Sequence, residues 1–224
     1  MENPMKSKSW RFVKRGLVPV LFAMLSSGCT TAYYAAMEKV GVHKRDILID
    51  RVEEARDAQQ VSQQEFKDAL DQLSQLVNFH GGQLQHQYEA LASQYQDSQQ
   101  AAQEVSQRID KVELVAFDLF AEWETELGQY QNKQLRSDSK KKLLETKRQF
   151  NALVKVMRRA ESKMPPVLRV LNDNVLYLKH NLNAKAVGAI QGEFGMLQQD
   201  VNQLLFEMNR AIAESNQFIA TMQQ

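Results

Sequence analysis

The chain has 224 residues, with 28 Lys and Arg against 27 Asp and Glu, a formal net charge of +1. It is poor in Gly and Pro and rich in Gln, Leu, Ala, Glu and Lys, which favours long helices and argues against sheets. Its single cysteine excludes an intramolecular disulfide.

Residues 1–28 are predicted to be a signal peptide. Five basic residues and only Glu2 as an acid occupy the first fifteen positions, and ten residues without a charge, 16–25, follow. A helix of that length rises about 15 Å, half of a hydrocarbon core about 30 Å thick. The pattern is therefore typical of a secretion signal and too short for a membrane span.

The segment Leu25-Ser26-Ser27-Gly28-Cys29 resembles the lipobox of bacterial lipoproteins, although Ser26 stands where an aliphatic residue is usual. The resemblance implies that Cys29 is acylated and becomes the first mature residue. The alternative is an ordinary cleavage site with an incidental cysteine. In the Gram-negative pattern an Asp after the cysteine retains the protein in the inner membrane. Because Thr30 follows here, we expect an outer-membrane anchor that faces the periplasm.

Residues 29–44 form a predicted tether, whose Tyr33 and Tyr34 suit either the lipid interface or the surface of a bundle. A heptad repeat runs from Leu48 to Leu76 and predicts a first helix. A second repeat from Leu84 to Tyr130 predicts another. Gly81 and Gly82 lie between them, so we expect a coiled-coil hairpin over 45–131.

A polar stretch, 132–140, is interpreted as a linker. Later heptads predict helices over 141–164, 167–183 and 186–223, with Pro165-Pro166 ending one helix and opening the next. Gly188, Gly192 and Gly195 lie on one face and predict a close helix crossing. The predicted fold is all-α: an elongated antiparallel helical bundle over 45–224, from which the long coiled-coil hairpin projects.

Four segments resemble a gammaproteobacterial family that carries only a domain-of-unknown-function label. They are YYAAMEKVGVHKRDIL (33–48), FAEWE (120–124), MRRAESKMPPVL (157–168) and VLYLKHNLNAKAVGAIQGEF (175–194). The resemblance covers essentially the whole mature chain. It implies a secreted or lipid-anchored helical protein and carries over no catalytic residues.

Catalytic and metal-binding motifs are missing from the sequence. It has no phosphate-binding loop, no H-E-x-x-H and no C-x-x-C, and its four histidines lack the spacing that places two on one helical face. We therefore expect no catalytic residue, cofactor or metal. The best polar cluster is Tyr177, His180 and Asn181, which suits either a small ligand or a satisfied polar contact at a helix junction.

Charge is distributed unevenly along the chain. Residues 140–163 hold nine basic side chains against Glu145 and Glu161, whereas residues 83–131 hold nine acidic ones against two basic. With Leu143 at heptad position a, Lys141, Arg148 and Lys155 all fall at the outermost position f. These three residues suit an anionic lipid, an anionic envelope polymer or an acidic protein, or else form a solvated face. Periplasmic residence argues against nucleic acid.

Two classes of function remain open. The first is a non-enzymatic envelope lipoprotein, attached to the membrane through its anchor, that acts as a scaffold or adaptor for other envelope proteins or for further copies of itself. The second is a ligand-binding or catalytic module that uses the region of Tyr177, His180 and Asn181.

Overall fold

The computed structural model describes residues 43–79 and 84–223. The predicted signal peptide, Cys29 and all of the tether except its last two residues lie outside these ranges. The described chain forms four α-helices and no strand: α2 (Lys44–Val77), α3 (Leu84–Glu126), α4 (Lys133–His180) and α5 (Ala184–Met222). The prediction of an all-α helical bundle is confirmed.

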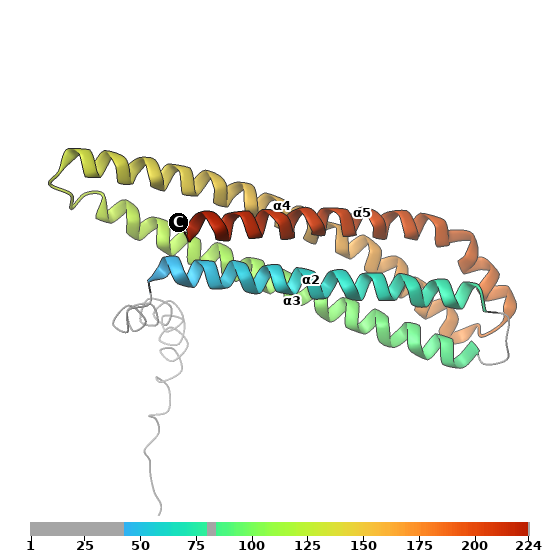
Figure 1. Ribbon diagram of the computed structural model, residues 1–224. Coiled ribbons are helices and arrows are strands. Elements are labelled where there is room, and N and C mark those ends of the chain that lie inside the picture. Colours follow the sequence, from blue (N-terminus) through green and yellow to red (C-terminus); the bar gives the residue numbers. More distant parts are fainter. Residues whose placement is uncertain (1–42, 80–83, 224) are drawn as a thin grey trace, which may run out of the picture. The chain divides into compact units, whose positions relative to one another are not determined.

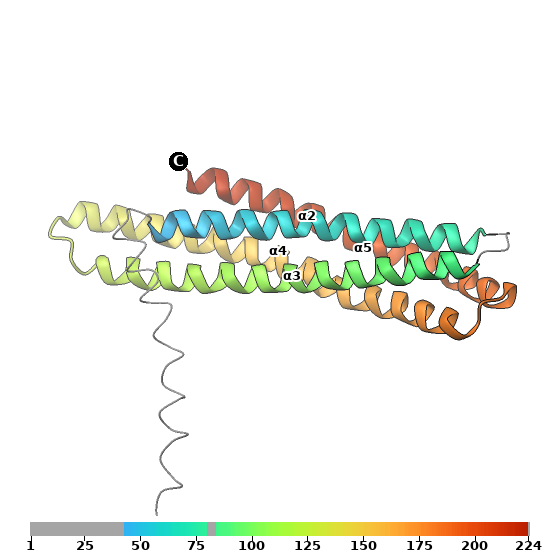
Figure 2. The same cartoon turned by 90° about the horizontal axis from the view of Figure 1, so that it is seen from below.

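The four helices form an antiparallel bundle in which each packs against two others. The neighbouring pairs are α2–α3, α3–α4, α4–α5 and α5–α2, so the last pair closes a ring (Figure 1). Hydrogen bonds from Arg56 to Asn216 and from Gln63 to the carbonyl of Leu205 show that α2 and α5 run in opposite directions. The second view shows the same alternation of direction (Figure 2). Consequently α2 and α4 lie diagonally and run parallel.

The hairpin of α2 and α3 does not project from the bundle, contrary to the prediction. It forms one half of the four-helix ring, because α5 packs on α2 and α4 packs on α3. Edge-to-face contacts join three helices where Phe120 meets Phe150 at 5.5 Å and Phe150 meets Phe218 at 6.1 Å between ring centroids. The long C-terminal helices thus cover the hairpin.

The core follows the heptad repeats. All nine seam positions predicted for α2 are buried: Leu48, Val52, Ala55, Gln59, Ser62, Phe66, Ala69, Leu73 and Leu76. Polar contacts flank this seam. Arg108 of α3 reaches Glu54 of α2 at 2.5 Å, and Arg51 also pairs with Glu54. Burial raises the pKa of Glu54, but the hydrogen bonds and charges of the two arginines lower it by more. The net pKa therefore lies below the ordinary value.

The predicted linker over 132–140 is wrong, because residues 133–140 are the first turns of α4. The side chain of Asn132 caps this helix by accepting hydrogen bonds from the backbone N–H groups of Gln134 and Leu135, at 2.9 and 3.1 Å. The indole of Trp123 donates to Ser139 at 2.8 Å and ties the extension to α3. In turn, α3 ends at Glu126, four residues earlier than predicted.

The predicted break at Pro165-Pro166 is also wrong, since α4 continues through both prolines to His180. Each proline lacks an N–H group, so two carbonyls of the preceding turn lose their helical partners. Both prolines are exposed, so they lie on the side of α4 that faces water, and water can bind those carbonyls. The buried seam runs through the pair without interruption, from Met164 to Val167 and Leu171. Packing of this seam offsets the cost of the prolines.

Candidate interaction surface

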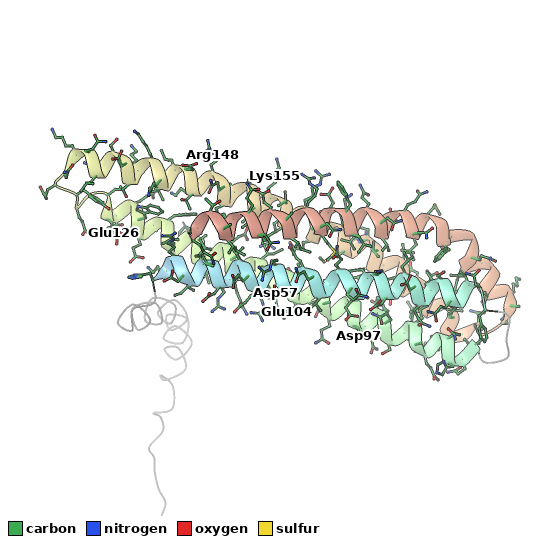
Figure 3. The ribbon with its side chains drawn as sticks, viewed as in Figure 1. Asp57, Asp97, Glu104, Glu126, Arg148 and Lys155 are labelled. Carbon is green, nitrogen blue, oxygen red and sulfur yellow. The ribbon has the colours of Figure 1, made fainter. Side chains whose placement is uncertain are left out.

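Lys141, Arg148 and Lys155, here called the basic stripe, lie along the outer face of α4. Leu143, Phe150 and Met157 are buried at position a, so the stripe occupies position f, and all three of its side chains are exposed. Figure 3 shows Arg148 and Lys155 on the outer edge of the helix. Successive members are about 10.5 Å apart along the axis.

The basic stripe makes almost no ion pairs within the described part of the chain. Arg148 is 79% exposed, and the only described carboxylate that it pairs with is Glu145 on the same helix, at 3.7 Å. Lys141 and Lys155 have no ion pair among the described residues. Lys141, Leu144, Glu145 and Arg148 line a shallow, open hollow on the surface of α4 itself. The stripe is therefore free to contact another molecule.

Other cations of the same helix pair with the acidic helix α3. Lys147 contacts Glu124 at 2.5 Å and lies over the ring of Phe120. Arg158 binds Asp110 at 2.5 Å and also Glu113. Burial lowers the pKa of Arg158, but its hydrogen bonds to carboxylates raise it further, and the net pKa lies above the ordinary value. The opposite charges of α3 and α4 are thus matched by residues outside the stripe.

Another cation of α4, Arg159, pairs with a buried carboxylate. Glu207 of α5 is only 2% exposed, and it pairs with Arg159 at 2.8 Å and with Arg210 at 3.3 Å. This buried carboxylate was not singled out from the sequence. Its position directly before the seam residue Met208, and one turn after Leu204, was the available signal.

The cluster of Tyr177, His180 and Asn181 lies at the C-terminal end of α4. The side-chain amide of Asn181 donates to the carbonyl of Tyr177 at 2.9 Å, and its backbone N–H donates to the carbonyl of Leu178 at 3.0 Å. Both of these bonds satisfy carbonyls of the last helical turn. Tyr177 is 41% exposed and His180 is also exposed. The hydrogen bonds of this cluster therefore serve to end the helix.

The close helix crossing predicted from Gly188, Gly192 and Gly195 is wrong. All three glycines are exposed, and a Cβ atom added at any of them would meet no other atom within 4 Å. The spacing that placed them together on one face was correct, but that face points outward.

Three aspartates of α2 and one arginine of α4 were missed in the sequence. Asp50, Asp57 and Asp71 are exposed at position f of α2, and Arg169 extends the outer face of α4 beyond Lys155 by two heptads. The signal was the seven-residue spacing, which becomes visible for Arg169 only when α4 is treated as one helix.

The described residues were compared with the requirements of a membrane-spanning helix and of a metal site. None of the described helices has a stretch long and apolar enough to cross a bilayer. Within the same residues, no three His, Cys, Asp or Glu side chains come together as metal ligands.

Comparison with known proteins identifies a family. No curated protein and no solved structure matches the chain. A family model described as "Protein of unknown function (DUF2959)" matches residues 33–222, which include all four helices. The chain therefore belongs to the DUF2959 family.

Proposed function

We propose that this protein is a non-enzymatic envelope lipoprotein that docks through the basic stripe of α4 on an acidic partner surface. Acylated Cys29 anchors it to the membrane, the outer membrane in preference to the inner, and the helical unit faces the periplasm. It acts as a scaffold or adaptor.

The exposure of the basic stripe is the observation that carries this proposal. Lys147, Arg158 and Arg159 each have a carboxylate partner on a neighbouring helix. Among the described residues, the stripe has no carboxylate partner on another helix, although it lies on the same helix as those three cations. Residues that stabilised the bundle by ion pairs would be expected to point toward α3 or α5, as those three do.

Attachment to a membrane suits such a surface. A single exposed ion pair contributes only about 0–1 kcal/mol. Three exposed charges in a row therefore form a weak site in solution. Their electrostatic attraction is screened beyond about 8 Å at physiological salt. Anchoring confines the protein and its partner to one surface and raises their effective concentration. Weak, regularly spaced contacts are then sufficient for docking.

Site-specific photo-crosslinking in the native envelope tests the proposal. Ser162 is exposed at position f between Lys155 and Arg169, so a crosslinker placed there sits in the docking face without removing a charge. Gln199, exposed on the outer face of α5, is the matched control position. We expect adducts from position 162 and none from position 199.

Two charge variants complete the experiment. Replacing Lys141, Arg148 and Lys155 by Glu should abolish the adducts from position 162. Replacing Lys133, Arg136 and Lys142 by Glu makes the same change in net charge at exposed positions of α4 outside the stripe, and it should preserve them. Adducts that survive in the first variant, or disappear equally in both, would overturn the proposal.

A further inference from the structure

Asp50, Asp57 and Asp71, here called the acidic stripe, repeat the pattern of the basic stripe on α2. They share position f with Gln64, and all three are exposed. Asp57 is 60% exposed, and its only ion pair among the described residues is with its neighbour Arg56, at 2.8 Å. Asp50 and Asp71 have no ion pair within the described ranges. The acidic stripe is therefore as free as the basic one.

The two stripes lie on opposite sides of the bundle. α2 and α4 are diagonal in the ring, and position f of each helix points away from the centre. Figure 3 places Asp57 on the other side of the helical unit from Arg148 and Lys155. Opposite charges so placed cannot meet within one molecule, but they can meet between two.

We propose that the acidic partner of the basic stripe is the acidic stripe of a second copy of this chain. The inference rests on the proposed function and names its partner. Both stripes follow a seven-residue repeat, so Asp50 and Asp57 are about 10.5 Å apart, as are successive members of the basic stripe, and two charges of each stripe can pair at once. Gln64 interrupts the acidic stripe before Asp71. Helix α4 carries 13 basic and 4 acidic residues and α2 carries 8 acidic and 5 basic, so the helices as a whole also attract.

An apolar residue accompanies each stripe. Leu144, 58% exposed, lies one turn from Lys141 and Arg148, and Val61, 57% exposed, lies one turn from Asp57 and Gln64. Burying these two side chains between copies would add an apolar contribution to the ion pairs. This contribution persists at salt concentrations that screen the charges.

The geometry of the contact determines the kind of assembly. The basic stripe of one copy meets the acidic stripe of the next, so the two surfaces of the interface differ. Each copy in a pair keeps one unused stripe on its far side, and a heterologous contact of this kind extends into an open row. Copies anchored to one membrane would form side-by-side rows rather than closed dimers.

Charge reversal and mixing test the proposal. The full acylated chain, with a photo-crosslinker at position 162, is reconstituted in vesicles of neutral phosphatidylcholine. Wild type should give a ladder of crosslinked dimers and larger species. Lys141→Glu, Arg148→Glu and Lys155→Glu together make both stripes acidic, and Asp50→Lys, Asp57→Lys and Asp71→Lys together make both basic. In each variant alone, the yield of crosslinked dimers and larger species should fall at least tenfold.

Mixing the two variants is the decisive step. An all-acidic copy and an all-basic copy present opposite charges, so a one-to-one mixture should restore the ladder. Restoration also demonstrates that both variants are folded. A control with Asp97, Glu193 and Asp200 replaced by Lys, exposed positions outside the acidic stripe, should retain the wild-type ladder.

The outcomes separate this inference from the proposed function. The crosslinker at position 162 could capture envelope components in a stripe-dependent way but never a second copy. In that case the proposed docking face is supported, and the proposal that a second copy is the partner is wrong. A mixture of correctly folded variants that gives no ladder also overturns the inference, with folding checked by far-ultraviolet circular dichroism. Binding of wild type to anionic vesicles without any ladder would identify lipid as the partner instead.

Discussion

Gln59 is the most consequential buried polar residue of α2, and replacing it by Leu should stabilise the protein. The side chain is fully buried, and neither its amide nitrogen nor its amide oxygen has a hydrogen-bond partner among the described residues. It lies between Arg56 and Gln63, which contact α5, so it occupies the interface of these two helices. A buried polar group without a partner costs about 1–3 kcal/mol.

The expected gain can be worked out from this cost. Leu is one atom shorter but of comparable size and has no polar atom, so the variant should recover about 2 kcal/mol in the free energy of unfolding, less any misfit of the branched side chain. For a helical unit of about 180 residues, that gain raises the melting temperature by about 4–8 °C. Thermal unfolding followed by far-ultraviolet circular dichroism measures it.

Gln60→Leu is the matched control for this prediction. Gln60 is the exposed neighbour, so the same substitution should change stability by less than about 0.5 kcal/mol. Destabilisation of Gln59→Leu by more than about 1 kcal/mol would refute the reasoning, because it would mean that the amide has hydrogen-bond partners in solution.

Three further predictions concern the prolines, a carboxylate and the anchor. Replacing Pro165 and Pro166 by Ala restores two helical hydrogen bonds and should raise the melting temperature; an unchanged or lower value would contradict a continuous α4. Because the folded-state pKa of Glu54 lies below its ordinary value of 4.5, its contribution to stability is present above pH 4.5 and lost as the pH falls through the folded-state pKa. Glu54→Gln should therefore flatten the acid side of the stability profile measured by urea unfolding, and an unaltered slope would argue against this role. Cys29→Ser should release the protein from membranes or leave uncleaved precursor, and an unmodified mature N-terminus in the mass spectrum of wild type would exclude acylation.

The seams of the bundle could be predicted because burial in a coiled coil follows sequence spacing. The four-and-three repeat of α2 identified every buried seam position, including the polar Gln59 and Ser62. The corresponding repeat of α4 identified Lys141, Arg148 and Lys155 as exposed. Position on a helix is a local property, so one sequence suffices to predict it.

Helix ends were harder to predict because packing competed with local preference. Proline disfavours a helix interior, yet the seam from Met164 to Leu171 holds α4 together. An uninterrupted heptad through residues 157, 160, 164, 167 and 171 was the signal for one helix. At the other end of α4, the cap is Asn132, nine residues before the predicted start at residue 141.

Partners between helices could not be predicted at all. Which cations of α4 meet α3 depends on the axial offset between the two packed helices. The sequence of one helix does not determine that offset. Arg158 meets two carboxylates 45 and 48 residues away, whereas Arg148 meets no described carboxylate outside its own helix. The distinction between structural cations and the basic stripe therefore needed the three-dimensional structure.

The most direct test of the basic stripe as a docking face measures stability and association on the same sample. We predict that the variant with Lys141, Arg148 and Lys155 replaced by Glu keeps a free energy of unfolding within about 0.5 kcal/mol of wild type, because these side chains are exposed and make no ion pair with another helix among the described residues. The same variant should lose the crosslinked adducts from position 162. A clear loss of stability with the adducts retained would show that the stripe supports the fold, and no change in either quantity would leave it a solvated face.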